Sequence, residues 1–201
     1  MSISVSRAVP ALLLSVLLSG GSVLLAAPAQ ADRWTYDDAV GDVTQLVETD
    51  TSLSVQSVPE QANGDIVQVA VDHRRSKVVI DIRTRTRITG AFIAGVELRT
   101  RGHHFALMWM RAPGANSAEL MDFNSKDLTV RCGDLKRRLV AGRTGIRLSV
   151  PRTCLDDPRW VRVGATLSTF GLVTGQSMDD DGLRTGTTLS GASGKSPKIR
   201  R

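Results

Sequence analysis

The stretch "DIVQVAVDHRRSKVVIDIRTRTRI", residues 65–88, decides the fold class. Apolar and polar side chains alternate from Asp65 to His73, and the alternation resumes at Val78 after the polar break RRSK at 74–77. A period of two places successive side chains on opposite faces, which is typical of a strand with one buried face. Two such runs joined by a short polar connection predict an antiparallel hairpin.

The same pattern recurs downstream in "AFIAGVELRT" (91–100), "HHFALMWMR" (103–111), "IRLSVP" (146–151) and "WVRVGATLSTF" (160–170). Both faces of 103–111 are apolar, which indicates a central strand covered on both sides or a strand that lines a pocket. No segment has a convincing amphipathic helical pattern, and the nearest is the acidic stretch 37–50. About ten short strands separated by turn signals predict an all-β fold, an antiparallel, jelly-roll-like β-sandwich.

The first 31 residues have the pattern of a signal peptide. An apolar run, "ALLLSVLL", precedes Ala29 and Ala31, which have the small-residue spacing that signal peptidase accepts. The alternative is a membrane anchor, but Ser, Gly and Pro residues interrupt the apolar stretch. We therefore expect a secreted, extracellular protein with no transmembrane segment after cleavage. The predicted organisation is a signal peptide (1–31), a β-sandwich domain (32–183) and a flexible basic tail (184–201).

The chain has two cysteines, Cys132 and Cys154. In an exported protein the simplest expectation is one disulfide bond between them. With no third cysteine, a cysteine-based zinc site is not expected.

The formal net charge of +6 favours anionic partners, such as cell-envelope polymers, acidic glycans or phospholipid headgroups. The alternative is that the charge serves solubility alone. Specific nucleic-acid binding is not expected, because no aromatic side chains are interleaved with the basic residues for base stacking.

Catalytic signatures are missing from the sequence. It contains no G-x-S-x-G elbow, H-E-x-x-H pair, phosphate loop or G-x-G-x-x-G turn. We therefore predict no catalytic residues and no organic cofactor, and expect a protein that is not an enzyme.

Three arginines, Arg83, Arg85 and Arg87, alternate along the second run of the opening stretch. On one face of a strand, they would form a ladder able to bind carboxylate or phosphate groups bidentately. The alternative is a solvated outer face with acidic cross-strand partners.

Two acidic runs lie near the ends of the predicted domain, "DDAVGDV" at 37–43 and "DDDG" at 179–182. Neither has the twelve-residue pattern of an EF-hand. If the chain ends meet at one edge of the sandwich, Asp38, Asp42 and Asp180 could share a calcium ion, which prefers hard oxygen ligands. The alternative is a pair of ordinary acidic turns.

Three segments carry a resemblance: "DDAVGDV", "GDIVQVAVDHRRSKVVIDIR" (64–83) and "VPRTCLDDPRWVRVGA" (150–165). Their order resembles a group of exported bacterial β-sandwich proteins whose domain is similar to carbohydrate-binding module family 9 and the DOMON-type fold. The resemblance implies export and a non-catalytic role, and relatives in that fold bind sugars, haem or calcium. It favours a secreted binding or envelope-associated protein whose ligand is a glycan or an anionic wall polymer. A secreted hydrolase with an unrecognised site and a protein-interaction module remain as alternatives.

Overall fold

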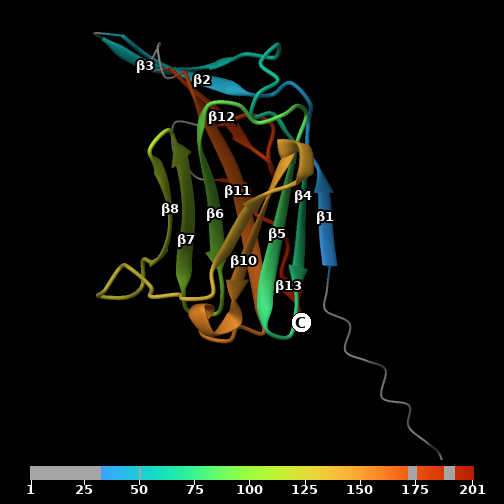
Figure 1. Ribbon diagram of the computed structural model, residues 1–201, viewed down its shortest axis with the longest axis vertical. Coiled ribbons are helices and arrows are strands. Elements are labelled where there is room, and N and C mark those ends of the chain that lie inside the picture. Colours follow the sequence, from blue (N-terminus) through green and yellow to red (C-terminus); the bar gives the residue numbers. More distant parts are fainter. Residues whose placement is uncertain (1–32, 50, 172–175, 188–192) are drawn as a thin grey trace, which may run out of the picture.

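Two antiparallel sheets pack against each other in the computed structural model, which describes residues 33–49, 51–171, 176–187 and 193–201 (Figure 1). The five-stranded sheet has the order β1 (Arg33–Asp37), β4 (Ile66–His73), β5 (Lys77–Thr84), β10 (Gly145–Pro151), β9 (Lys136–Leu139). The second sheet has the order β3 (Ser52–Ser57), β2 (Thr44–Thr49), β12 (Ser177–Asp181), β11 (Trp160–Phe170), β6 (Ala91–Arg99), β7 (His104–Ala112), β8 (Ala115–Asp122), and β13 (Ile199–Arg200) pairs with β11. The prediction of an all-β antiparallel sandwich is confirmed, and the predicted signal peptide lies outside the described residues.

The opening stretch forms the β4–β5 hairpin. Its turn is closed by a hydrogen bond from the Arg74 amide to the Lys77 carbonyl, at 2.9 Å. The register is regular except for a β-bulge between Ile66 and Gln68. Simple alternation places these two side chains on the same face, but the extra residue of a bulge reverses the facing of the chain. Ile66 is therefore fully buried, while Gln68 remains on the outer face.

Branched aliphatic residues build most of the core between the sheets. Residues with no exposed surface come from both layers, among them Val71, Ile80, Leu98, Leu148 and Leu167. Phe92 and Trp109 add an edge-to-face aromatic contact, with ring centroids 5.1 Å apart. In the part of the chain that the structure describes, no helix is long and apolar enough to span a membrane.

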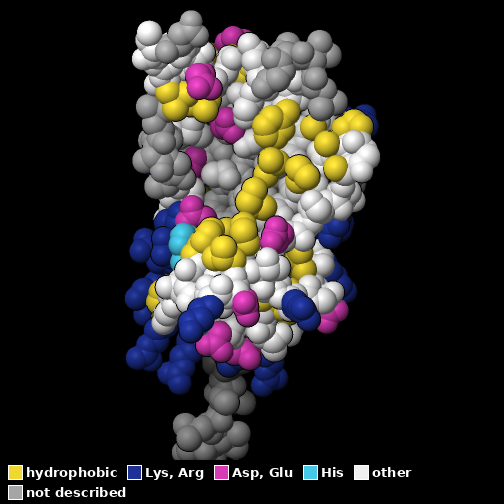
Figure 2. All heavy atoms as spheres, turned by 90° about the vertical axis from the view of Figure 1, so that its left-hand side faces the viewer, with side chains coloured by type: hydrophobic (Ala, Val, Ile, Leu, Met, Phe, Trp, Pro, Cys, Tyr) yellow, Lys and Arg dark blue, Asp and Glu magenta, His cyan; other side chains and the backbone are white. Residues whose placement is uncertain are grey.

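The two apolar faces of β7 have different environments. Its inner face is buried, but Met108 and Met110 on the opposite face are 42% and 40% exposed. This side of the molecule also displays patches of hydrophobic side chains (Figure 2). The prediction that β7 is covered on both sides or lines a pocket is wrong for this outer face, because β7 lies next to the edge strand β8 and no described segment covers it.

The C-terminal segment differs from the predicted flexible tail. Residues 193–201 lie along β11, and Ile199 is only 3% exposed. The Ser196 amide donates to the Val163 carbonyl, and its hydroxyl accepts from the Val163 amide at 2.9 Å. The segment approaches β11 at Gly164, where a β-carbon would collide with Ser193. The tail prediction is therefore wrong for this segment, since it relied on low apolar content and could not include backbone pairing.

The disulfide between Cys132 and Cys154 is present, as predicted, across a separation of 22 residues. Cys132 precedes β9, and Cys154 lies in a short 3-10 helix, η2 (Arg152–Leu155), that follows β10. A second 3-10 turn, η1 (Ala141–Arg143), connects β9 to β10. The bond therefore joins the two outer ends of the β9–β10 hairpin.

Candidate metal centre

Two segments far apart in the sequence bring three carboxylates together. Asp38 and Asp42 lie in the loop between β1 and β2, and Asp180 lies in β12. The strand β2 pairs with β12, with Asp179 opposite Thr44, so the loop before β2 lies beside the end of β12. One carboxylate oxygen from each of the three aspartates lies within 4.8 Å of the others. The structure therefore brings together all three residues that the sequence singled out for calcium.

Burial distinguishes this cluster from an ordinary acidic surface. Asp180, Asp42 and Asp38 are only 1%, 8% and 9% exposed. Both carboxylate oxygens of Asp38, and Oδ1 of Asp42 and Asp180, accept no hydrogen bond from the described residues. Buried polar atoms nearly always have a partner, and a buried carboxylate without one is costly. Four such oxygens in one cluster make it a candidate site for a positively charged ligand.

Backbone amides hold two of the three carboxylates in place. The Ile66 amide donates to Asp180 Oδ2 at 2.5 Å, and the Gly186 amide donates to Asp42 Oδ2 at 2.9 Å. Each amide occupies one oxygen of its carboxylate and leaves the other oxygen, Oδ1, for the cluster. The carboxylates of Asp180 and Asp42 are thus positioned by the β4 strand and by the segment after β12.

Two further aspartates surround the cluster. Asp65 is fully buried and accepts hydrogen bonds from the Gly41 amide at 2.9 Å and from Arg85 at 3.3 Å. Asp181 accepts from the Gly194 amide at 2.7 Å and from Arg184 at 3.0 Å. Each of these two carboxylates has a cationic partner, whereas Asp38, Asp42 and Asp180 have none among the described residues.

The electrostatics reflect this crowding. Burial, followed by the charge of Asp42, raises the pKa of Asp38 from 3.8 to about 7. Burial also raises the pKa of Asp180 to about 8, with the charges of Asp42 and Asp38 adding to the effect. Neighbouring carboxylates that resist ionising together have a strong affinity for either protons or a cation.

The donor set fits calcium. Calcium takes six to eight oxygen ligands at about 2.3–2.6 Å, so two ligands on opposite sides of the ion lie about 5 Å apart. The 4.8 Å span of the three carboxylate oxygens lies within this limit. The ligand groups are all carboxylates and come from irregular positions in a loop and a strand end. Calcium tolerates such flexible geometry better than magnesium, which requires a near-ideal octahedron.

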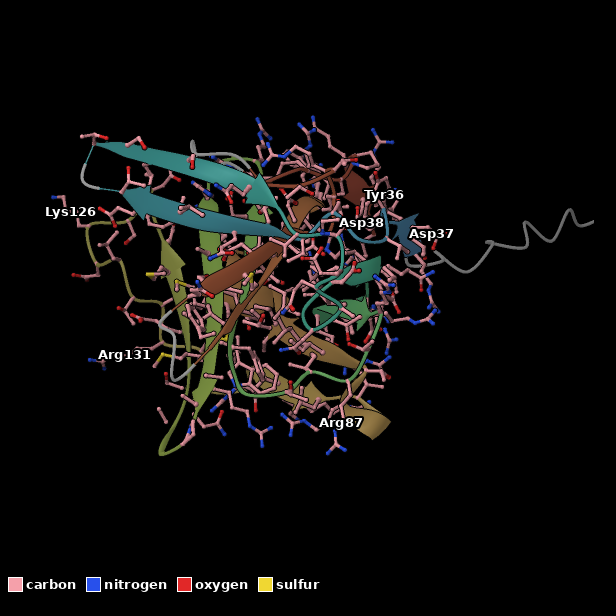
Figure 3. All side chains as sticks on the ribbon, turned by 90° about the horizontal axis from the view of Figure 1, so that it is seen from above. Tyr36, Asp37, Asp38, Arg87, Lys126 and Arg131 are labelled. Atoms are coloured by element: carbon pink, nitrogen blue, oxygen red, sulfur yellow. A yellow bond between two sulfur atoms is a disulfide. The ribbon has the colours of Figure 1, made fainter. Side chains whose placement is uncertain are left out.

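The arginines predicted to form a ladder are separated by the fold. Only Arg83 lies in β5, which ends at Thr84, and it hydrogen-bonds Gln68 at 3.4 Å. Arg85 turns toward the acidic cluster and pairs with Asp65. Seen from above, Arg87 lies far from Asp38, toward the edge of the molecule (Figure 3). The ladder prediction is wrong in its geometry, because the chain bends after Thr84 and the alternation does not continue.

Sequence reasoning missed Asp65 as part of the site. It lies just before β4 in the segment "NGD" and appeared only as the first residue of an alternating strand. The sequence clue to Asp65 was its pairing with Arg85, twenty residues later. Only the geometry of the hairpin brings these two residues together.

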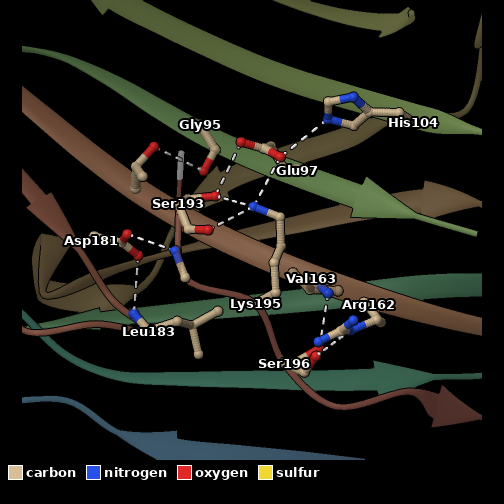
Figure 4. Close-up of polar contacts among 12 residues, drawn as sticks. Gly95, Glu97, His104, Arg162, Val163, Asp181, Leu183, Ser193, Lys195 and Ser196 are labelled. Carbon is tan, nitrogen blue, oxygen red and sulfur yellow. Dashed lines mark hydrogen bonds and ion pairs between the residues drawn. The ribbon is translucent and has the colours of Figure 1, made fainter. Parts of the chain in front are cut away.

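A second polar network fixes the C-terminal segment to the outer face of the second sheet (Figure 4). Glu97 on β6 accepts from Lys195 at 2.9 Å, from Ser193 at 3.1 Å and lies 3.1 Å from His104 Nε2. Burial acts to raise the pKa of Glu97, but the hydrogen bond and charge of Lys195 outweigh it, and the pKa is lowered. Lys195 also lies 2.5 Å from the Ser193 hydroxyl, but an ammonium ion paired with a carboxylate cannot act as a general base. The network therefore anchors the chain and lacks an activated nucleophile.

Comparisons of this chain with protein-family models, with curated proteins and with solved structures found no match.

Proposed function

We propose that the protein is a secreted, non-catalytic binding protein whose β-sandwich is completed by a calcium ion held by Asp38, Asp42 and Asp180. The observation that carries the proposal is the set of buried carboxylate oxygens without hydrogen-bond partners in the cluster. The ligands come from the β1–β2 loop and from β12, so the ion would join these two segments, which are far apart in the sequence.

Export is supported by two features. The first 31 residues have a signal-peptide pattern, and the disulfide bond between Cys132 and Cys154 is typical of proteins in oxidising compartments. An extracellular location would also supply calcium at concentrations that a moderate-affinity site can use, since extracellular modules bind it with dissociation constants of about 0.1–1 mM.

A binding role is favoured over catalysis by the chemistry of the polar clusters. The calcium ligands are buried, and the Ser193–Lys195 pair lacks a free base because Lys195 is engaged by Glu97. The resemblance to carbohydrate-binding and DOMON-type domains is in keeping with a binding role. We propose a glycan or an anionic envelope polymer as the ligand class.

Thermal melting in calcium and in a chelator tests the calcium proposal. We expect saturating calcium to stabilise the protein by about 3 kcal/mol when its concentration is one hundred times the dissociation constant. The Asp42→Asn variant should lose this response. The Asp37→Asn variant is the matched control, because Asp37 is exposed and, among the described residues, its side chain accepts a hydrogen bond only from Gln68. An unchanged melting temperature across millimolar calcium, with no heat of binding by calorimetry, would refute the proposal.

A further inference from the structure

A groove of about 270 Å³ crosses the outer face of the five-stranded sheet. Its floor contains short side chains, since Val79 on β5 lies directly opposite Ser149 on β10. Its walls are long basic side chains from β5, β9, β10 and the β4–β5 turn. The basic lining residues are Arg74, Lys77, Lys136, Arg137, Arg138 and Arg147.

The charge of this groove is only partly balanced from within. Arg147 is held by both oxygens of Asp81, and Arg74 is paired with Asp72 at 2.6 Å. The other lining cations have no ion pair among the described residues, and Arg137 makes only a hydrogen bond to the Asn116 carbonyl, at 3.2 Å. The side chains of three of them make neither an ion pair nor a hydrogen bond in the described part of the chain: Lys77, Lys136 and Arg138.

The register of β9 and β10 places two basic residues of the groove directly opposite each other. Arg138 lies directly opposite Arg147 across the β9–β10 pair. Like charges in directly opposed positions are destabilising, and Asp81 already uses both oxygens on Arg147. Lys136 lies on the same face of β9, two residues before Arg138 and about 7 Å from it along the strand. An anionic ligand across β9 and β10 would relieve this repulsion.

We infer that this groove binds a linear polymer that carries a phosphate group in each repeat. The inference deepens the binding role in the proposed function and does not depend on calcium. Lys136 and Arg138 lie on one face of β9, and Lys77 lies two strands away on β5. The unpaired cations are therefore spread along the groove, which suits an anion with repeating charge better than one small ion. Two of the three, Lys77 and Lys136, are lysines, which bind phosphate as point charges and cannot match a planar carboxylate with a bidentate fork.

The lining also argues against nucleic acid as the occupant. No aromatic side chain borders the groove, whereas proteins that bind single strands stack bases on aromatic rings. The inferred polymer therefore has a phosphate backbone and no need for stacked bases.

Another basic hollow, of about 400 Å³, is bordered by Arg152, Arg159, Trp160, Arg200 and Arg201. Arg152 there is buried and donates to the carbonyls of Arg75, Asp157 and Pro158. The Arg152 guanidinium is thus occupied by backbone carbonyls of the protein itself. A substitution in this hollow, Arg159→Ser, therefore serves as a comparison in the test.

The test uses the full-length protein without added calcium and inorganic polyphosphate as the probe, measured by calorimetry at fixed ionic strength. We expect the double variant Lys136→Ser/Arg138→Ser to bind polyphosphate about tenfold more weakly or worse, as for lost charge-assisted contacts. The double variant Arg87→Ser/Arg101→Ser removes the same charge from two exposed loops, and should change affinity by less than about twofold. The variant Lys136→Arg/Arg138→Lys keeps the charge and should retain binding.

The inference would be overturned if the groove and loop variants weakened binding equally, or if Arg159→Ser abolished binding instead. It would also be overturned if poly-glutamate or single-stranded DNA bound more tightly than polyphosphate. Absence of any polyphosphate binding would also overturn it. A separate calcium titration of the same variants, without polyphosphate, distinguishes this failure from a failure of the calcium proposal, because none of the substituted residues lies in the acidic cluster. Melting curves of each variant show whether the fold is retained.

Discussion

Asp180 Oδ2 accepts a hydrogen bond from the backbone amide of Ile66 at 2.5 Å, across 114 residues of sequence. Ile66 begins β4 in the five-stranded sheet, whereas Asp180 lies in β12 of the other sheet. This contact therefore joins the two layers at the point where a buried carboxylate, 1% exposed, also faces the acidic cluster. The joint between the layers and the candidate calcium centre share the same side chain.

Substitution of Asp180 by Asn should have opposite effects on the metal-free and calcium-loaded protein. The amide side chain keeps an acceptor for the Ile66 amide and removes a buried negative charge. We expect the metal-free variant to be as stable as the wild type or more stable at pH 8, and to lose the stabilisation by calcium. Chemical denaturation with and without calcium measures both quantities.

The matched control for this substitution is Asp179→Asn in the same strand. Asp179 accepts hydrogen bonds from the hydroxyls of Ser168 and Ser177, at 2.5 and 2.9 Å, and is not part of the cluster. It should keep the full response to calcium. A similar loss of response in both variants would show that strand charge, and not ligation, is responsible.

The metal-free protein should lose stability as the pH rises. Burial raises the pKa of Asp38 to about 7 and that of Asp180 to about 8, both above the ordinary 3.8. A carboxyl group with a raised pKa in the folded state contributes stability that is complete below its unfolded pKa and is lost as the pH rises through the folded value. Between about pH 5 and pH 8 we expect a decrease of a few kcal/mol in the free energy of unfolding.

Calcium should reverse this trend, because protons and the cation compete for the same carboxylates. Calcium affinity measured by calorimetry should increase between about pH 5 and pH 8, and saturating calcium should flatten the pH profile of stability. A metal-free profile equally flat in wild type and Asp180→Asn would contradict the assigned cause.

Removal of the disulfide bond should destabilise the protein. It closes a loop of 22 residues between Cys132 and Cys154, for which the chain-entropy account gives about 3 kcal/mol. We expect the Cys132→Ala/Cys154→Ala variant to lose about this much in denaturant unfolding. Alkylation of the native wild-type protein should find no free thiol, and two reactive thiols would contradict the bond.

Local patterns predicted the fold where local rules were sufficient. The alternation of residues 65–88 predicted the β4–β5 hairpin and its buried face, because strand facing depends on period alone. The bulge that buries Ile66 was not predictable, since nothing in the alternation marks the extra residue. The predicted ladder of Arg83, Arg85 and Arg87 was wrong for a similar reason. The strand β5 ends at Thr84, but the alternation in the sequence continues past this point and does not mark the end.

The metal centre was predictable in its residues but not in its geometry. Acidic runs near both ends of the domain indicated Asp38, Asp42 and Asp180, and their meeting depended on the pairing of β2 with β12. Asp65 enters the site through the β3–β4 connection, and no local motif links it to the other aspartates. Long-range pairings of this kind are a property of the whole topology and not of any one segment.

The C-terminal segment offers the sharpest contrast between a composition-based prediction and the packed structure. A flexible tail would tolerate any substitution, but Ile199 is 3% exposed and its carbonyl lies 3.1 Å from Nδ1 of the buried His73. We expect Ile199→Ala to cost about 3 kcal/mol in the free energy of unfolding, as for other large-to-small substitutions in a core. Lys198→Ala removes only a cation–π contact with Trp160, and should cost less than about 1 kcal/mol. Equal stability of both variants and the wild type in urea would show that residues 193–201 do not contribute to the fold in solution.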